Sequence, residues 1–509
     1  MIDVTPLLRF YAKRRRARLA AEDAVDVQRA QMLRLVAHAA GTQFGRAHDF
    51  AGISSVQSYQ ARVPVRSYEE FWQEWWQPRF PNLADVTWPG SIPYFAISSG
   101  TTSGASKIIP VSSAMMRSNE RAATEVLVHH ITHRLRSRVL GGRTFMVGGS
   151  ADLKQEAPNI FSGDLSGIAA KRTPAWARWL TFPPLEIALM NDWDKKVDAC
   201  VARMDASNIR AITGTPSWLL VIFDRHAVTR GVAPRARTLY PNLELIVHGA
   251  VNFTPYRDRF DAFLDGSHAE LREVYPASEG FIALADETPN DGLRLLADNG
   301  LFYEFIPVDE LGSRTARRLW LADVELGVNY AIAVTSNAGL WSYLLGDTVR
   351  FVSLKPPRLV VTGRTSYMMS AFGEHLIEEE IEDAIASAAR GIAANVTDFS
   401  LGATYSTRQG ELGGHLFIVE FSAPVDATAL AMFARLIDQR LSTLNDDFRG
   451  HRADGFALAA PRVQVVPPGF FAHWMKSRGK LGGQHKVPRM LSDPAKFTAL
   501  RRYADDYAL

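Results

Sequence analysis

The spacing of apolar and polar residues divides the chain into a helical beginning and a longer part in which strands and helices alternate. Residues 1–92 show mainly helical spacing, clearest over residues 21–39. Further along, a short apolar run at residues 209–216 leads into a helical pattern at residues 218–225, and the same order recurs over residues 243–264. This alternation predicts an α/β domain with parallel strands, in which ligands bind at the carboxyl ends of the strands.

Antiparallel strands are expected after this region. The apolar runs that predict them lie at residues 270–275, 300–305, 317–321 and 330–335. Residues 276–280 read as the loop that follows the first of these runs. Residues 340–351 predict two strands joined by a turn at Gly346-Asp347, because this dipeptide is common in turns.

A domain boundary is expected near residues 362–366, because the pattern there changes to a charged helix at residues 376–389. The predicted architecture is an α/β fold with two domains. The large N-terminal domain, residues 1–363, contains β-sheets flanked by helices. The smaller C-terminal α+β domain, residues 364–509, is expected to act as a mobile lid.

Composition narrows the class of protein. The chain has 509 residues, 47% of them hydrophobic, and its formal charge of +3 gives no electrostatic case for nucleic acid or a membrane as the main partner. The single cysteine, Cys200, excludes an internal disulfide and fits a reducing cytoplasm. No secretory signal is expected, and no apolar run approaches the roughly 18 residues that span a bilayer. The basic run at residues 13–18 reads as the solvated face of an amphipathic helix.

Three histidines raise the question of a metal site. His129 and His133 are four residues apart and would share one helix face, as zinc ligands often do. The glutamate of the His-Glu-x-x-His motif is missing, and no third ligand is evident. We therefore expect His129, His130 and His133 to be surface or pocket-lining residues.

The strongest candidate for chemistry is the stretch at residues 93–112. An apolar extended segment is followed by Ser98, Ser99, Gly100, Thr101 and Thr102, and then by Lys107. Small residues leave backbone N–H groups open to an anion, while hydroxyls and a lysine add donors and charge. The spacing differs from the common P-loop, in which the lysine directly follows the second glycine. The residues alone leave two interpretations open, a polyphosphate-binding loop or a surface turn between strands.

This loop resembles the phosphate-binding motif of the adenylate-forming enzymes. More narrowly, it resembles that of the Gretchen Hagen (auxin-responsive promoter) family of acyl acid amido synthetases. Five further stretches are similar to family motifs in the same order, and they lie at residues 214–218, 241–250, 275–279, 343–347 and 478–489. The last of them is similar to the C-terminal signature of bacterial members. Pro276 and Leu344 depart from the usual motif residues, which leaves substrate detail open.

The resemblance implies a role for each motif residue. Gly249 and Ala250 belong to the loop that stacks against adenine, and Tyr275 supplies a flat ring for the same base. Ser278 supplies a hydroxyl for a phosphate or an acyl carboxylate. Lys486 and Glu279 are the expected catalytic residues, and Glu279 is also the expected metal ligand. Asp347 and Arg364 are expected to bind the ribose. From the residues alone, the preferred interpretation of Glu279 is a solvated strand-end acid. Lys486 could be one more surface lysine, although Gly482-Gly483 could carry it into a site.

The reaction implied by the resemblance has two steps and uses ATP and Mg²⁺. A carboxylic acid forms an acyl-adenylate, and an amine, expected to be an amino acid, then takes the acyl group. Two alternatives stay open, transfer to a thiol such as coenzyme A and a catalytically inactive nucleotide-binding module. We expect a cytoplasmic monomer or weak homodimer with small-molecule partners.

Overall fold

The fold is taken from a computed structural model. It describes residues 3–98, 107–146, 153–173, 177–188, 190, 193–249, 253, 256–287, 291–313, 315–365, 376–404, 413–445, 448–449, 452, 458–478, 486–491 and 493–507. Ser99, Gly100, Thr101, Thr102 and Ala250, all predicted site residues, lie outside the described residues.

The chain forms two compact units, unit 1 at residues 1–361 and unit 2 at residues 362–509. The helices described for unit 1 are α1 (Thr5–Ala21), α2 (Ala24–Ala39), α3 (Gln43–Ala47), α4 (Val56–Arg62), α5 (Tyr68–Phe71), α6 (Ser113–His133), α7 (Leu165–Arg172), α8 (Leu185–Ala188), α9 (Trp193–Met204), α10 (Pro216–Arg230), α11 (Ala236–Leu239) and α12 (Arg257–Leu264). The single helix expected at residues 21–39 was wrong at its start, because Asp23 leaves the helical conformation and its carboxylate caps α2.

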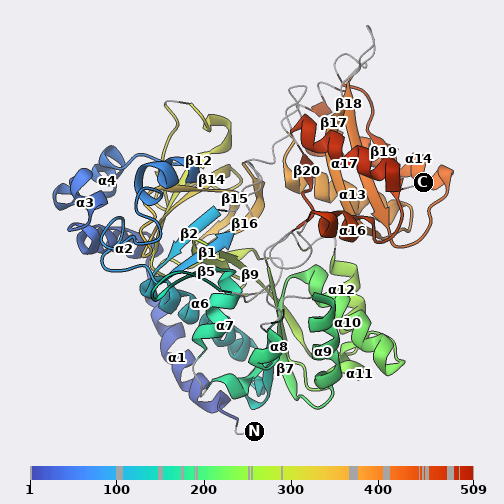
Figure 1. The fold of residues 1–509 in the computed structure, drawn as a ribbon, viewed down its shortest axis with the longest axis horizontal. Helices are drawn as coiled ribbons and strands as arrows, with labels where there is room; N and C mark the ends of the chain where they lie inside the picture. Colours follow the sequence, from blue (N-terminus) through green and yellow to red (C-terminus); the bar gives the residue numbers. More distant parts are fainter. Residues whose placement is uncertain are drawn as a thin grey trace. The chain divides into compact units, whose positions relative to one another are not determined.

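Two sheets form the framework of unit 1 (Figure 1). The smaller has the order β2-β1-β5-β4, with β1 (Tyr94–Ser98), β2 (Lys107–Val111), β4 (Lys154–Ala157) and β5 (Ile160–Gly163). The larger has the order β13-β12-β14-β15-β16-β11-β10-β9-β8-β7-β3-β6. Its strands are β3 (Arg143–Met146), β6 (Thr181–Phe182), β7 (Ile209–Gly214), β8 (Leu245–Gly249), β9 (Glu270–Ala277), β10 (Gly280–Leu284), β11 (Leu293–Leu295), β12 (Leu301–Pro307), β13 (Leu319–Trp320), β14 (Asn329–Ser336), β15 (Tyr343–Leu354) and β16 (Pro357–Arg364).

The parallel strands predicted from the alternating pattern are present. Strands β6, β3, β7, β8 and β9 pair in parallel, and helix α10 follows β7 with Pro216 in its first turn. Alternate residues of these strands face opposite helical layers. Ile212 and Ile246 pack with Phe223 of α10, whereas Ala211 and Leu245 pack against the side of α1 and α6. Both faces of this parallel part of the sheet are therefore covered, as such sheets require.

The turn predicted at Gly346-Asp347 was wrong, because β15 is one continuous strand. Ala331 of β14 pairs with Thr348, but Ala333 pairs with Leu344, so extra residues of β15 bulge out of the ladder between these pairs. Gly346 lies in the bulge with φ +95°, a conformation that glycine adopts without steric cost. Asp347 therefore lies within a strand of the sheet, next to the bulge, and not at the tip of a loop.

The loop predicted at residues 276–280 is also shorter than expected. Strand β9 continues to Ala277, and β10 pairs back onto it from Gly280, so only Ser278 and Glu279 form the turn. The antiparallel partner β10, which the local pattern did not reveal, extends β9 beyond Tyr275. Ser278 and Glu279 are consequently held by a tight hairpin, and both are buried.

Unit 2 has its own sheet and core. The sheet has the order β19-β18-β17-β20, with β17 (Val396–Thr404), β18 (Gly414–Phe421), β19 (Arg462–Val466) and β20 (Met490–Leu491). Its helices are α13 (Glu378–Gly391), α14 (Ala427–Leu444), α16 (Phe470–Ser477) and α17 (Pro494–Tyr507). Ile385 of α13 and Phe433 of α14 share one hydrophobic cluster with Phe417 of β18. This sheet with packed helices matches the expected α+β composition of the C-terminal part.

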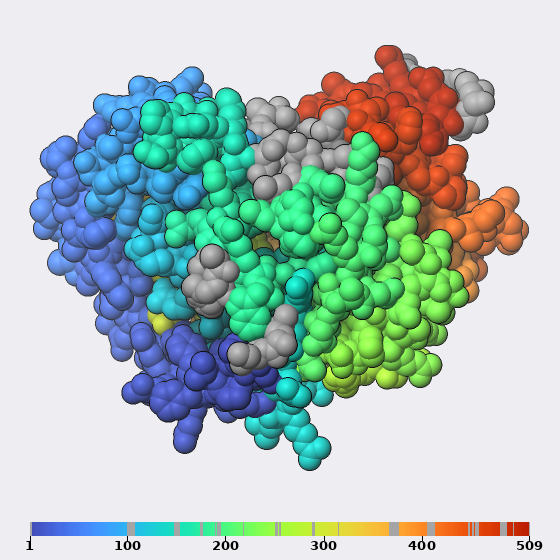
Figure 2. Space-filling view, turned by 60° about the horizontal axis from the view of Figure 1, so that its bottom comes forward, coloured from blue at the N-terminus to red at the C-terminus, as the bar shows by residue number. Residues whose placement is uncertain are grey.

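The basic run at residues 13–18 lies on α1, at the surface of unit 1 (Figure 2, dark blue). Lys13, Arg14 and Arg16 are exposed, as the solvated-face interpretation predicts. Arg15 is the exception, since it is buried and forms ion pairs of 2.8 Å with both Glu125 and Asp298. In the described part of the chain, no helix combines the length and the apolar character that a bilayer crossing demands.

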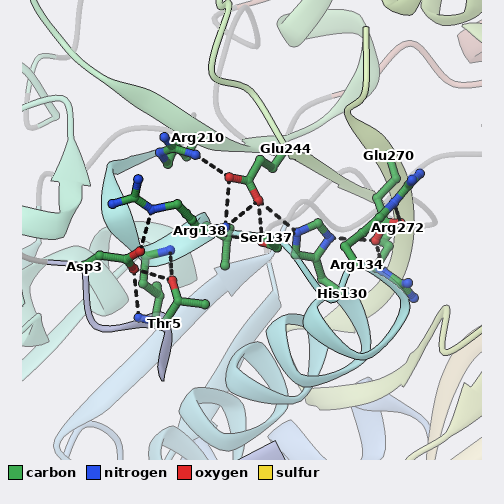
Figure 3. A network of polar contacts seen from close by, with 12 residues as sticks. Asp3, Thr5, His130, Arg134, Ser137, Arg138, Arg210, Glu244, Glu270 and Arg272 are labelled. Atoms are coloured by element: carbon green, nitrogen blue, oxygen red, sulfur yellow. Dashed lines mark hydrogen bonds and ion pairs between the residues drawn. The ribbon is translucent and has the colours of Figure 1, made fainter. Parts of the chain in front are cut away.

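Of the two alternatives expected for His129 and His130, the surface position was wrong, and the pocket-lining position stays a prediction. Both are buried on α6, and His130 lies at the centre of a polar network shown in Figure 3. Its Nδ1 lies 2.7 Å from Glu270 Oε1, and its Nε2 lies 3.0 Å from the hydroxyl oxygen of Ser137. Glu244 accepts hydrogen bonds from Ser137 and Arg210. The network ties the end of α6 to the amino ends of β8 and β9.

The hydrogen-bond pattern requires His130 to carry two ring protons. The Ser137 hydroxyl donates its one proton to Glu244, so the Ser137 oxygen accepts from Nε2 of His130, and Nδ1 must donate to the Glu270 carboxylate. Burial opposes this charge, but the nearby carboxylate of Glu244, 3.7 Å from Nε2, and the hydrogen bond to Glu270 outweigh burial and raise the pKa of His130. Burial would raise the pKa of Glu244 and of Glu270, yet His130 and the hydrogen bonds that the two carboxylates accept hold each pKa at about 2.

Candidate active site

The proposed phosphate loop connects two antiparallel strands. Ser98 ends β1, Lys107 begins β2, and the two residues are paired across the hairpin. The residues between them fall outside the described part of the chain. The pairing places the first serine of the motif opposite its lysine, so both approach any ligand from the same end of the hairpin.

Lys107 lies between two tyrosines. Its Nζ is 3.5 Å from the phenol oxygen of Tyr343, the long end of a hydrogen bond, and 5.8 Å from the centre of the Tyr343 ring. The same atom lies 5.6 Å from the Tyr68 ring, whose hydroxyl accepts a hydrogen bond of 2.9 Å from Ile108 N–H. Cation–π attraction therefore restrains the lysine side chain near the strand ends.

Glu279, in the hairpin turn between β9 and β10, is linked to the same tyrosine. Its carboxylate charge acts on the Tyr343 phenol, and only 6% of Glu279 is exposed. Burial, together with the negative charge of Glu279, raises the pKa of Tyr343 well above 10, so the phenol stays protonated. Glu279 is thus not the solvated strand-end acid that the residues alone allowed.

Asp347 and Tyr275 form a second link between the same strands. The Tyr275 hydroxyl donates to Asp347 Oδ2 at 2.6 Å, a distance typical of a charge-assisted bond. Both residues are buried, and the Tyr275 ring packs in the hydrophobic core. The bulge in β15 supplies the backbone conformation that carries Asp347 at this position.

Gly249 ends β8 where no side chain fits. A Cβ atom there would lie 2.2 Å from the carbonyl oxygen of Val274, the residue before Tyr275. The preceding residue, His248, stacks on Phe253 with 4.0 Å between ring centres, and its Nδ1 has no hydrogen-bond partner among the described residues. Burial, with a contribution from Arg257, lowers the pKa of His248 to about 3, so the ring is neutral. Packing therefore fixes the backbone on both sides of the proposed adenine loop.

The predicted site residues divide between the two units. In unit 1, Ser98, Lys107, Tyr275, Glu279 and Asp347 lie on β1, β2, the β9–β10 hairpin and β15, with Ser278 beside Glu279 in the turn. Arg364, at the end of β16, and the exposed Lys486 belong to unit 2. Tyr68 and the role of Tyr343 were missed by sequence reasoning. Tyr343 stands in a quoted motif, which could have pointed to it, whereas nothing in the sequence singled out Tyr68.

The donor set around Glu279 fits a nucleotide-bound magnesium ion. Among the described residues, no group of three or more His, Cys, Asp and Glu side chains is arranged around a common metal position. Mg²⁺ that accompanies a nucleotide takes most of its ligands from phosphates and water and needs only one or two carboxylates. Glu279 offers one such carboxylate, and Tyr343, which interacts electrostatically with Glu279, also contacts Lys107.

Family profiles match three parts of the chain. The GH3 family N-terminal domain matches residues 13–147, the GH3 family central domain residues 294–364, and the GH3 family C-terminal domain residues 379–495. The chain belongs to the GH3 family. The resemblance drawn from the motifs is thereby confirmed, since GH3 abbreviates Gretchen Hagen.

Curated GH3 relatives are distant in sequence. Indole-3-acetic acid-amido synthetase GH3.4 of Arabidopsis thaliana is 24% identical over 272 residues, 50% of this chain and 45% of the relative. Probable indole-3-acetic acid-amido synthetase GH3.12 of Oryza sativa subsp. japonica is 21% identical over 95% of this chain and 94% of the relative. For several of the relatives, including the first, the chain spans less than half of the relative's length.

Solved structures share the fold over nearly the whole chain. AtGH3.15 acyl acid amido synthetase in complex with 2,4-DB superposes with a TM-score of 0.78 at 17% identity, covering 95% of this chain and 94% of that one. 2-Hydroxyisobutyryl-CoA ligase in the postadenylation state superposes with a TM-score of 0.63 at 18% identity, covering 96% and 93%. The expected fold, that of the adenylate-forming enzymes, is thus confirmed.

Proposed function

We propose that this GH3 protein is an ATP-dependent acyl acid amido synthetase, a ligase. It activates a carboxylic acid as an acyl-adenylate and transfers the acyl group to an amine, most simply the amino group of an amino acid. The observation that carries the proposal is the linkage of Lys107, Glu279 and Asp347, through Tyr343 and Tyr275, within unit 1. The ammonium of Lys107 suits a phosphate chain, the carboxylate of Glu279 suits its metal ion, and the carboxylate of Asp347 suits a ribose.

In the first step, a carboxylate oxygen of the acid attacks the α-phosphorus of ATP. A new P–O bond forms, and the bond to pyrophosphate breaks. Lys107 and the loop from Ser98 to Thr102 stabilise the negative charge on the phosphates.

Asp347, held by Tyr275, accepts hydrogen bonds from the ribose hydroxyls, and Arg364 donates to the same sugar. Gly249, Ala250 and Tyr275 bind adenine, and Ser278 donates to a phosphate or to the acyl carboxylate. Mg²⁺, held by Glu279, supplies charge neutralisation at the phosphates when bound.

In the second step, the amine nitrogen attacks the acyl carbonyl. The amide C–N bond forms, the amine loses a proton, and the C–O bond to AMP breaks. We propose that residues 1–363 bind ATP and the acid, that residues 364–509 act as the lid, and that Lys486 serves adenylation. The names of the relatives, acid-amido synthetases, support a carboxylic acid as the acyl donor and an amine as the acceptor.

Acid-dependent exchange between ATP and labelled pyrophosphate tests the first step. A panel of aromatic and aliphatic carboxylic acids should contain members that support exchange. Glu279→Gln should lower the exchange rate by about 10²-fold, because it removes charge at the metal position. The matched control Glu325→Gln, at an exposed position outside the site, should leave the rate unchanged. ATP binding without exchange for any acid would instead support an inactive nucleotide-binding module.

A further inference from the structure

Two tyrosines from distant parts of the chain flank the Lys107 side chain. The Lys107 ammonium lies 5.6 Å from the centre of the Tyr68 ring and 5.8 Å from that of the Tyr343 ring. Its Nζ also lies 3.5 Å from the phenol oxygen of Tyr343. Because an aromatic ring attracts an ammonium, the two rings together restrict the directions in which the lysine points.

A backbone bridge joins the segments that carry the two tyrosines. Arg66 and Tyr343 form an isolated parallel bridge. The N–H of Arg66 donates to the Ser342 carbonyl at 3.1 Å, and the N–H of Leu344 donates to the Arg66 carbonyl at 2.8 Å. Tyr68 begins helix α5 two residues after the bridge, and a capping box fixes the start of that helix. Backbone hydrogen bonds therefore set the distance between the two rings.

Ser342, the residue before Tyr343, has an unusual backbone conformation. Its φ is +48°, in the left-handed region that residues other than glycine seldom adopt. Its N–H donates to Thr335 Oγ1 at 2.9 Å, its hydroxyl donates to Glu304, and its hydroxyl oxygen accepts from Arg318 at 2.9 Å. Ser342, Thr335 and Glu304 are fully buried. Such strain persists only where the surroundings enforce it, so this network fixes the direction in which the chain enters Tyr343.

Tyr68 also contacts the strand on which Lys107 stands. Its hydroxyl oxygen accepts a hydrogen bond of 2.9 Å from the N–H of Ile108, the second residue of β2. Its ring stacks on that of Trp72, with 6.1 Å between the ring centres. Tyr68 therefore restrains Lys107 at both ends of the side chain, at the backbone beside it and at the ammonium.

We propose that Tyr68 is a positioning residue that holds the Lys107 ammonium in place for the phosphate chain of a nucleotide. Lysine carries its charge on a flexible stem, and holding that stem in advance lowers the entropy lost when the phosphates bind. Tyr68 touches neither the nucleotide nor the reacting atoms in this account and acts through Lys107. The inference rests on the proposed function, because it assigns the phosphates to Lys107.

A double-mutant cycle on ATP affinity, measured by calorimetry with Mg²⁺ present, separates this role from packing. Tyr68→Leu removes the ring and should lower ATP affinity about threefold to tenfold, the range expected for a lost cation–π contact. In a Lys107→Met background, which lacks the ammonium, the same substitution should change ATP affinity little further. Tyr503→Leu is the matched control, because Tyr503 of unit 2 is also partly buried and its ring stacks on His473. The control should bind ATP as the wild type does.

Equal losses of affinity from Tyr68→Leu in the two backgrounds would overturn the inference, and so would unchanged affinity in the folded single variant. If Tyr68→Leu does not fold, Tyr68→Phe is compared with pentafluorophenylalanine at the same position. Fluorination nearly preserves the shape of the ring but reverses the charge of its face, so it should weaken ATP binding relative to phenylalanine. Equal affinities would contradict the inference. Failure of the wild-type protein to bind ATP would instead count against the proposed function, so the two failures are distinguishable.

Discussion

The hydroxyl of Tyr275 lies 2.6 Å from a carboxylate oxygen of Asp347, although the two residues are 72 positions apart. The pair joins the strand before the Ser278-Glu279 turn to the bulge in β15. Tyr275 therefore has two proposed roles. Its ring contacts adenine, and its hydroxyl positions the Asp347 carboxylate that we assign to the ribose. The nucleotide assignments of these two residues depend on each other.

Replacing Asp347 should weaken nucleotide binding. Asp347→Ala leaves the ribose hydroxyls and the Tyr275 hydroxyl without their acceptor, which should cost about 1–3 kcal/mol of ATP binding free energy. Calorimetry measures this directly. Asp323→Ala, at an exposed position, is the control and should bind ATP as the wild type does. Wild-type affinity in Asp347→Ala would remove Asp347 from the site.

A methyl group at position 249 should disturb the proposed adenine loop. The Cβ of Gly249→Ala would lie 2.2 Å from Val274 O, so β8 and β9 must move apart. We expect destabilisation by roughly 1–3 kcal/mol, measured by chemical unfolding, together with weaker ATP binding. Gly41→Ala is the control, because no atom of the described residues lies within 4 Å of its Cβ. Equal stabilities of the two variants would show that the strands do not approach as closely as described.

The His130 network predicts a pH-dependent stability. The pKa of His130 is raised above 6.5 in the folded protein, so its contribution to the unfolding free energy is complete below pH 6.5 and declines as the pH rises through the folded value. The pKa values of Glu244 and Glu270 are about 2, so their contribution is complete above their unfolded value near 4.5 and declines toward pH 2. His130→Gln should therefore cost most between pH 4.5 and 6.5, roughly 3 kcal/mol.

Urea unfolding at several pH values measures this difference. His268→Gln, at an exposed histidine, should have little effect at any pH. A cost of His130→Gln that stays constant from pH 5 to pH 9 would mean that His130 is neutral in the folded protein, contrary to its hydrogen-bond pattern.

Lys486 should matter for adenylation far more than for amide formation. Its proposed task is to neutralise charge as pyrophosphate leaves, and this task ends once the acyl-adenylate exists. Lys486→Ala should lower ATP–pyrophosphate exchange by about 10²-fold or more, while ATP affinity changes little because the other phosphate-binding residues are in unit 1. Lys476→Ala, another exposed lysine of unit 2, is the control.

The second half-reaction separates this role from general damage. Lys486→Ala, given presynthesised acyl-adenylate and amine, should still form amide at a substantial rate. An equal fall in both half-reactions would refute the assignment to adenylation.

The sequence predicted those features that depend on neighbouring residues. The apolar run at residues 209–216 and the helical pattern after it correspond to β7 and α10 because strand and helix spacing are local properties. The family was identified from short motifs for the same reason. Residues that fold back on distant partners were not predicted. Gly346-Asp347 read as a turn, because the pairing with β14 that makes it a bulge depends on residues before position 335.

Burial of charged residues escaped prediction for a related reason. Arg15 stands among exposed basic residues and has the same local surroundings, but its partners Glu125 and Asp298 lie more than 100 positions away. His130 likewise depends on Glu244 and Glu270. The hydrogen bond between Tyr275 and Asp347 likewise joins two motifs that only the fold brings together.

Product identification tests the central claim most directly. The protein is incubated with ATP, Mg²⁺ and an acid that supports pyrophosphate exchange, together with either a mixture of amino acids or coenzyme A, and AMP and product masses are recorded. The account predicts that amino acids accelerate AMP release and that a product appears with the mass of acid plus amino acid minus water. Turnover with coenzyme A, a thioester mass and no amide with any amino acid would contradict it.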